Sequence, residues 1–329
     1  MIQDEEKDQQ DSAIPASETP GSGAHSDFDP TDPKWRVSAR FGPDKMDRWT
    51  YPISEDPWTL AHDALRGEVR DFGRALQNIA GVGKDADKAV DTNIDVNNDG
   101  SGSAPMLVTE RQIVAMQSWW KGHLLHLSSH HHNEDLLVER FVRNRFHYPD
   151  FMTTDHDDLK EHTDRLDEII SKDASTILNA KKEDRHAKDE SRPIENLNSN
   201  TTLMTPPVAS AFFGTLLEAW QQYEATLLLH LQTEEDCAIP LLRAYFGPTR
   251  VQIFLTNRLA QAGPAVETGS IVHYVGKEKL GRNMIVHQKV PPILAKLSWA
   301  LILGPRHRKY EQTMLSYLAD MNNLEKDKQ

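Results

Sequence analysis

The chain is poor in cysteine, in net positive charge and in long apolar runs, and each of these absences argues against a class of protein. Its single cysteine, Cys237, among 329 residues excludes a disulfide within the chain and fits a reducing compartment. The net charge of −13 argues against nucleic-acid binding. The first residues are acidic, without the apolar core of a signal peptide, and the longest apolar run, Leu294 to Leu303, is too short for a membrane span. We therefore expect a cytoplasmic protein.

What the chain does contain is a series of segments with apolar residues at helical spacing. Residues 1–50 precede them and are rich in Asp, Ser, Pro, Gly and Gln, which predicts a disordered tail. Four long helices are predicted, one starting at Asp56-Pro57 and the others at about 109–145, around 156–170 and at 208–245. Exposed connectors are expected at 81–105 and 181–207.

Shorter helices are expected after residue 250, where Gly-Pro and Pro-Pro pairs interrupt the pattern. Residues 290–303 are apolar enough to pack against the longer helices, and residues 310–321 predict a last amphipathic helix. We interpret this part as a helical cover over the rest, with the wall of a small-molecule pocket as the alternative.

Two of the long helices carry a histidine followed four positions later by a glutamate. These pairs are His130 with Glu134 and His230 with Glu234, and a helix places both members of each pair on one face. The rest of that face is apolar, and several further identities at a constant offset of 100 residues indicate that the two helices are copies. Buried histidine and carboxylate groups are costly unless they are compensated, and a metal ion is the simplest compensation.

The other two long helices each carry one inward histidine, His62 or His156, with a cation four positions later. The chain therefore reads as two copies of one two-helix unit. Packed antiparallel, two such units make a four-helix bundle, in whose core metal sites are built from facing helices. Four histidines and two glutamates at one level would suit two metal ions bridged by carboxylates.

The order of these motifs resembles that of the hemerythrin-like, or HHE cation-binding, family over about residues 55–248. The segment after residue 250 looks like the long variant common in fungi. The resemblance implies an all-α, up-down four-helix bundle over residues 51–250, with a disordered tail at 1–50. It also implies a helical extension at 251–329 that packs on the bundle.

The resemblance further implies a non-haem di-iron centre, with a bridging oxo or hydroxo group. Its metal ligands would be His62, His130, His156 and His230, with Glu134 and Glu234 as bridging carboxylates and Glu235 as the alternative to Glu234. Manganese or zinc would suit the same ligands.

One departure from the family concerns the third helix. Oxygen-carrying members have two histidines there, four residues apart, whereas this chain has Lys160 four residues after His156 and Met152 four residues before it. His131 and His132 lie off the apolar face and are expected to be solvated or to support the ligands from behind. Six protein ligands are thus expected instead of seven, leaving open positions that favour activation of oxygen or peroxide over reversible carriage.

Two functions fit these expectations. In the first, the protein binds or senses O2 or NO, or handles iron. In the alternative, it is a di-iron oxidase or oxygenase acting on a small organic substrate. A closed apolar cavity beside the metals, larger than a diatomic molecule needs, would favour the alternative. The oligomeric state is not predicted.

Overall fold

The computed structural model describes residues 27–43, 45–81, 108–137, 142–176, 206–249, 251 and 264–322. These residues are mostly helical and contain no strand beyond one isolated bridge between Arg36 and Phe146, so the predicted all-α class is confirmed. Residues 1–26 and most of both predicted connectors lie outside the described residues. No helix in the described ranges is long and apolar enough to cross a bilayer.

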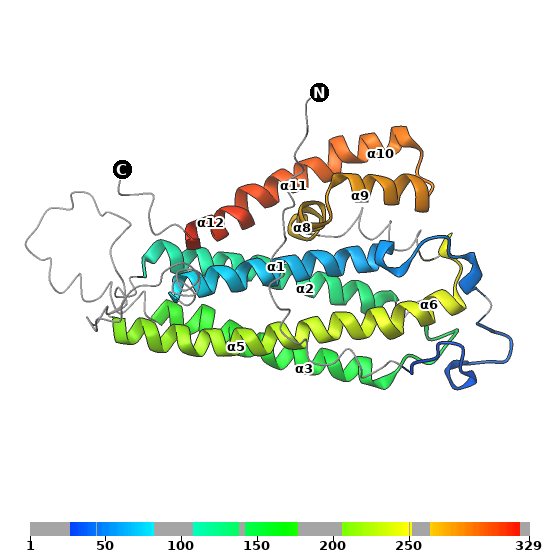
Figure 1. Cartoon of the computed structure of the whole chain (residues 1–329), viewed down its shortest axis with the longest axis horizontal. Helices are drawn as coiled ribbons and strands as arrows, with labels where there is room; N and C mark the ends of the chain where they lie inside the picture. Colours follow the sequence, from blue (N-terminus) through cyan, green and yellow to red (C-terminus); the bar gives the residue numbers. More distant parts are fainter. Residues whose placement is uncertain are drawn as a thin grey trace, which may run out of the picture.

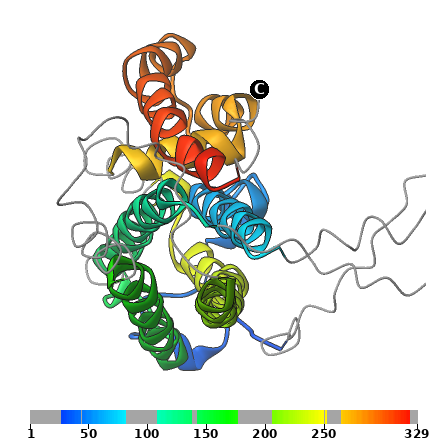
Figure 2. The ribbon, with the colours of Figure 1, turned by 90° about the vertical axis from the view of Figure 1, so that its left-hand side faces the viewer.

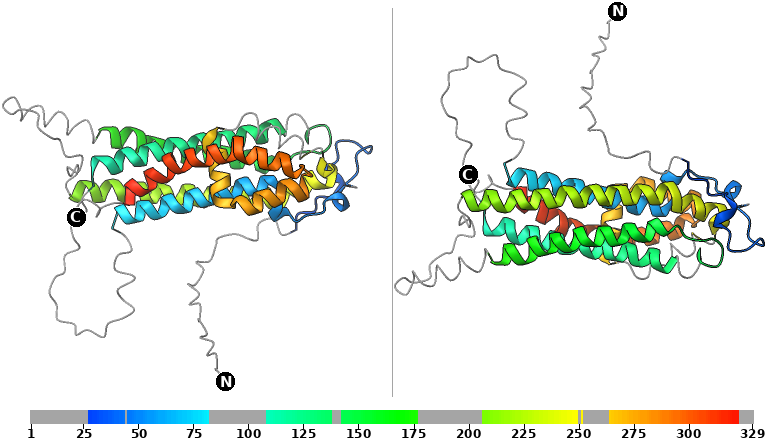
Figure 3. Two further views of the ribbon diagram at one scale, coloured as in Figure 1. Left: turned by 90° about the horizontal axis from the view of Figure 1, so that it is seen from above. Right: turned by 90° about the horizontal axis from the view of Figure 1, so that it is seen from below.

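Four long helices lie side by side along the longest dimension of the molecule (Figures 1 and 3). They are α1 (Pro57–Ile79), α2 (Glu110–Leu137), α3 (Asp150–Asp167) and α5 (Pro206–Thr233). Helix α3 continues into a wider π-helical segment, η5 (Glu168–Asp173), and α5 continues through η6 (Glu234–Ala238) into α6 (Ile239–Tyr245). Each long helix predicted from the sequence is therefore present. Helix α2 is described only to Leu137, whereas the prediction ran to about residue 145, and residues 138–141 lie outside the described residues.

Local sequence explains how two of these helices begin and bend. The Asp56 side chain accepts a hydrogen bond from the Trp58 backbone N–H at 3.1 Å, and Pro57 occupies the first helical position, as predicted. Pro240 has no N–H to donate within the α5–α6 rod, and the helix widens into η6 just before it. Glu234 is the first residue of that wider turn.

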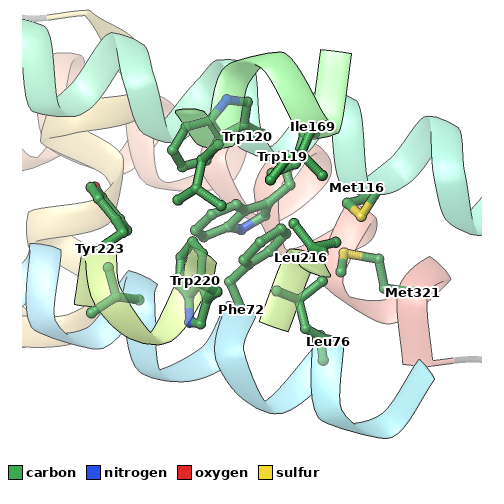
Figure 4. Packing of buried hydrophobic residues seen from close by; sticks show 14 of the residues in the cluster. Phe72, Leu76, Met116, Trp119, Trp120, Ile169, Leu216, Trp220, Tyr223 and Met321 are labelled. Atoms are coloured by element: carbon green, nitrogen blue, oxygen red, sulfur yellow. The ribbon is translucent and has the colours of Figure 1, made fainter. Parts of the chain in front are cut away.

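Two apolar clusters fill the space between the long helices. The larger contains stacked aromatic rings, with the Phe72 and Trp119 centroids 4.1 Å apart and Trp220 beside both (Figure 4). The smaller includes Leu137 and Ile239, three and five residues beyond the glutamate of the His-x-x-x-Glu motif of its helix. The motif residues therefore lie between the two clusters, with apolar packing on either side.

The described part of the predicted N-terminal tail, residues 27–43 and 45–50, lies against the ends of the long helices. Phe28, Trp35 and Phe41 pack against the smaller cluster. The Trp49 indole donates to the carbonyl oxygens of Arg243 at 3.1 Å and Phe246 at 2.9 Å. The segment is polar on average, but its aromatic residues provide the apolar surface for these contacts.

The described C-terminal residues form a layer over one side of the long helices (Figure 2). The layer consists of α8 (Ala265–Val275), α9 (Lys277–Arg282), η7 (Asn283–His287), α10 (Pro292–Ser298), η8 (Trp299–Leu303), α11 (Gly304–Tyr310), η9 (Glu311–Leu315) and α12 (Ser316–Asn322). Helices α8 and α12 contact α1 and α2. A side chain at Gly269 of α8 would come within 2.7 Å of the Arg306 carbonyl oxygen, so α8 and α11 also pack closely.

The expectation that residues 290–303 pack inward holds only in part. Ala295 is buried, but the large apolar side chains beside it are not. The exposed ones are Ile293, Leu294, Leu297 and Leu301. Helix α10 thus presents an apolar face to solvent.

Candidate metal centre

The histidines and glutamates predicted as ligands converge between the four long helices. One group of donor atoms comes from His62, His130, Glu134 and Glu234, and a second from His131, Glu134, His156 and His230. Within each group the donor atoms lie within 4.8 Å of one another, close enough for one ion. Glu134 belongs to both groups, so the two groups adjoin.

The two carboxylates each reach toward both groups. Glu134 Oε1 lies 2.8 Å from His130 Nε2, and its Oε2 lies 3.8 Å from His156 Nε2. Glu234 Oε2 lies 3.1 Å from His62 Nε2, and its Oε1 lies 3.8 Å from His230 Nε2. One oxygen of each carboxylate therefore faces each group, which is the disposition a bridging carboxylate needs.

Many of these donor atoms are buried without a hydrogen-bond partner. Within the described chain this holds for Nε2 of His62, His130, His131, His156 and His230, for His230 Nδ1, for Glu134 Oε2 and for Glu234 Oε1. Each unsatisfied buried polar group costs about 1–3 kcal/mol, and such groups are rare in folded proteins. A cluster of them made of imidazole nitrogens and carboxylate oxygens fits metal ions, which would satisfy one nitrogen of each ring and the carboxylate oxygens together.

Burial and the contacts between histidines and glutamates act in opposite directions on the charges in the cluster. Burial opposes ionisation of Glu134, but the neighbouring His130 holds its pKa well below the usual value. Burial lowers the pKa of His131 well below 6.5 and also lowers that of His230, so both are neutral near pH 7. Burial disfavours a charged His62, yet its contacts with Glu134 and Glu234 raise its pKa well above 6.5.

His131 is the donor that sequence reasoning missed, since it was expected to be solvated or to lie behind the ligands. Its ring stacks on His156 at a centroid distance of 4.6 Å and lies 5.4 Å from the His230 ring. With His131 the cluster holds seven donor residues, not the six expected. His132, the next residue, is exposed.

Glu235, the predicted alternative to Glu234, lies outside both groups. Its Oε1 accepts a hydrogen bond from His62 Nδ1 at 2.8 Å and another from the Arg66 guanidinium at 2.7 Å. The first of these contacts fixes the ring orientation of His62 and turns its Nε2 toward Glu234. A carboxylate in this position tunes a histidine ligand without binding the metal itself.

Trp58 also contributes to the cluster, although no role was predicted for it. Its indole N–H lies 2.9 Å from Glu134 Oε1 and 3.2 Å from Glu234 Oε2, so one donor is shared by both carboxylates. Trp58 lies four residues before His62, on the same face of α1. That spacing indicates that Trp58 points the same way as His62. Only the fold shows that its indole N–H reaches both carboxylates.

The two histidines nearest the motif of α2, His123 and His126, have partners of their own. Glu68 accepts from His123 Nδ1 at 2.6 Å and from His126 Nδ1 at 3.0 Å, and all three side chains are fully buried. Neither histidine belongs to a donor group. Both histidines instead bind the buried Glu68 carboxylate.

Two clefts give access to the second group of donors from the surface. One, of about 380 Å³, lies between α2 and α3 and is lined by His131, His156, Asp135, Lys160 and Thr163 among others. The other, of about 200 Å³, lies between α3 and α5 and reaches His230 past Asp155 and Glu161. Both are open and partly polar, unlike the closed apolar cavity that would favour an oxygenase.

Comparisons with protein-family models, with characterised proteins and with solved structures find no match to this chain.

Proposed function

We propose that this protein is a non-haem di-iron protein of the hemerythrin-like type, which binds or senses O2 or NO or handles iron. The observation that carries the proposal is the cluster of seven donor residues in two adjoining groups, whose unpartnered buried atoms a pair of metal ions would satisfy. In this proposal α1, α2, α3 and α5 form an up-down four-helix bundle around the ions.

The number and kind of donor residues support a pair of metal ions bound mainly by protein side chains. Five imidazoles and two carboxylates bind iron, manganese or zinc, and iron is the choice that the family resemblance adds. A bound iron pair would supply a redox-active, Lewis-acidic site for small ligands. The fifth histidine, His131, leaves fewer open positions than the six-ligand set predicted from the sequence. This favours ligand binding over activation of oxygen for attack on a substrate.

An oxidase acting on a small organic substrate is the second candidate. The volume of the cleft between α2 and α3 supports it, although the cleft is not closed. At about 380 Å³ the cleft exceeds what a diatomic molecule needs. Its lining includes Lys160, Thr163 and Asp135, so it suits a small polar substrate better than an apolar one. Metal-dependent O2 consumption that requires an added organic compound would favour this candidate.

The test of the metal centre compares two neighbouring histidines. We expect native protein loaded with ferrous iron under argon to hold two Fe per chain, one for each donor group. His131→Ala removes a donor from the second group only. It should lower the affinity for the second iron ion at least about tenfold. His132→Ala, at the adjacent exposed position, should leave both equivalents unchanged.

Elemental analysis and competitive titration against a chromophoric chelator measure these stoichiometries and affinities. Native protein that binds no iron, manganese or zinc would overturn the proposal of a metal centre. Equal binding by native protein and His131→Ala would remove His131 from the ligand set. Two zinc ions in protein isolated from its source, with iron excluded, would retain the centre but reject iron.

A further inference from the structure

The apolar face of α10 and η8 is a second feature that the described residues leave without a partner. Of the twelve large hydrophobic side chains exposed in the described chain, six lie within residues 285–301. Ile293, Leu297 and Leu301 follow at intervals of four, so they share one helix face, with exposed fractions of 66%, 47% and 73%. Singly exposed apolar residues are ordinary, but a contiguous stripe marks an interaction surface.

The charge of this region is opposite to that of the rest of the chain. Residues 279–310 contain seven lysines and arginines and no aspartate or glutamate. The remainder has thirty basic residues against fifty acids, a net charge of −20. A molecule divided in this way turns its basic part toward an anionic surface, because its acidic part is repelled.

Some of these cations are already neutralised, and others are not. Lys279 pairs with Asp63, and Arg282 pairs with Glu55. In the described part of the chain, no acid lies within ion-pair distance of Lys296 or Lys309, both of which are exposed. Lys296 is one residue before Leu297, at the edge of the apolar stripe, and Lys309 follows on the next helix, α11.

The position of this region allows it to reach a flat surface. Helix α10 lies on the outer side of the C-terminal layer, away from α3 and α5 (Figure 2). Segment η7, which carries the exposed Ile285 and Val286, contacts α10, so two more exposed apolar side chains lie on an element next to the stripe. The Lys277 ammonium lies 4.8 Å from the centroid of the Trp299 ring, which holds that aromatic residue at the edge of the patch.

We propose that α9, η7, α10 and η8 form a docking surface for an anionic lipid membrane, with the apolar stripe of α10 entering the interface and the flanking lysines facing the headgroups. An apolar face with cations at its borders is the pattern of helices that lie in the plane of a membrane. A second copy of the chain fits less well. In a symmetric dimer the same patch meets itself, which brings the two Lys296 side chains and their neighbours together.

The experiment uses the purified full-length chain and two kinds of vesicle, one of phosphatidylcholine alone and one of phosphatidylcholine with phosphatidylserine. Flotation separates bound from free protein. We expect binding to the phosphatidylserine vesicles that weakens as salt is raised, and little binding to the neutral ones. This assay is independent of the metal centre and is read without regard to iron content.

Two variants test the two components of the surface. Leu297→Ser with Leu301→Ser should lower partitioning at least about tenfold. Lys296→Gln with Lys309→Gln should lower it by roughly fivefold per charge. The matched control is Val114→Ser with Val208→Ser, which removes two exposed valines from α2 and α5 and should leave partitioning unchanged. Circular dichroism confirms that each variant is folded.

Three results would overturn the proposal. The first is native protein that stays free with both kinds of vesicle. The second is an equal loss of binding in the valine control, which would make the effect general to exposed apolar residues. The third is a native dimer that the leucine variant converts to a monomer, without vesicle binding, because the face would then join two copies of the chain.

Discussion

Replacing Trp58 by phenylalanine isolates the contribution of one hydrogen-bond donor to the metal centre. The ring stays apolar and aromatic, but the N–H that lies 2.9 Å from Glu134 Oε1 and 3.2 Å from Glu234 Oε2 is lost. Both carboxylates are buried, and a hydrogen bond to a charged group contributes about 1.5–3 kcal/mol. We expect the metal-free variant to lose about that much free energy of unfolding.

Metal affinity should fall as well, because the shared donor holds both acids in the positions from which they face the two donor groups. Loss of a group that orients ligands lowers metal affinity by about 10–100-fold. Trp49→Phe is the matched control. The Trp49 indole is also shared between two acceptors, but these are the backbone oxygens of Arg243 and Phe246. That control should lose about 1 kcal/mol of stability and keep the native affinity.

Urea unfolding of the metal-free proteins measures the first effect, and titration against a competing chelator measures the second. Unchanged metal affinity in Trp58→Phe, together with a stability loss equal to that of Trp49→Phe, would refute the reasoning. Trp58 would then be a packing residue whose contacts with the two acids have no bearing on the centre.

Three further predictions concern other positions in the fold. Burial opposes the charge of Glu68, but His126 and His123 lower its pKa to about 2, so its stabilisation is present above pH 4.5 and lost toward pH 2. Glu68→Gln should therefore flatten the fall in unfolding free energy over that range in acid titrations. Burial raises the pKa of the Cys237 thiol to about 12, so an aromatic disulfide reagent at pH 8 should label it only in denaturant. Gly269→Ala should cost about 1–3 kcal/mol in urea unfolding, because the new methyl group meets a backbone oxygen of α11, whereas Gly281→Ala, with open space around it, should cost nothing.

The long helices could be predicted because their signals are local. Asp56-Pro57 marks the start of α1, since a capping side chain and a fixed proline φ act within one turn. The His-x-x-x-Glu pairs could be located because a spacing of four defines a helix face in any context. The apolar residues on the same helix face predicted that these histidines and glutamates point into the core.

The inward position of His131 could not be predicted in the same way, because it depends on how many helices pack against α2. Successive residues on a helix point about 100° apart, so His130 and His131 cannot share a narrow face. Helix α2 has α1 on one side and the α3–η5 segment on another, which makes its buried arc wide. His130 then reaches His62 of α1, while His131 reaches His156 of α3. Periodicity along one helix contains no information about that second neighbour.

The near-repeat of the sequence also conceals a difference between its two copies. Arg143 and Arg243 occupy equivalent positions, yet Arg143 is exposed and Arg243 is buried. The Arg243 guanidinium donates to Asp56 Oδ2 at 2.9 Å and so holds the residue that caps α1. The end of α6 is thereby tied to the first turn of α1, which carries Trp58. Arg143, which is exposed, does not take this role.

The same asymmetry extends to the two donor groups, and it bears on how the proposed centre would work. The first group, around His62 and Glu234, is fully buried, and Trp58 and Glu235 hold its members in place. The second group borders both clefts, and the side chain of His156 is 24% exposed. An ion in the first group would therefore be enclosed by protein, whereas a small ligand arriving from solvent would meet the second group. Glu134 belongs to both groups, so its carboxylate is the side chain that would hold both ions.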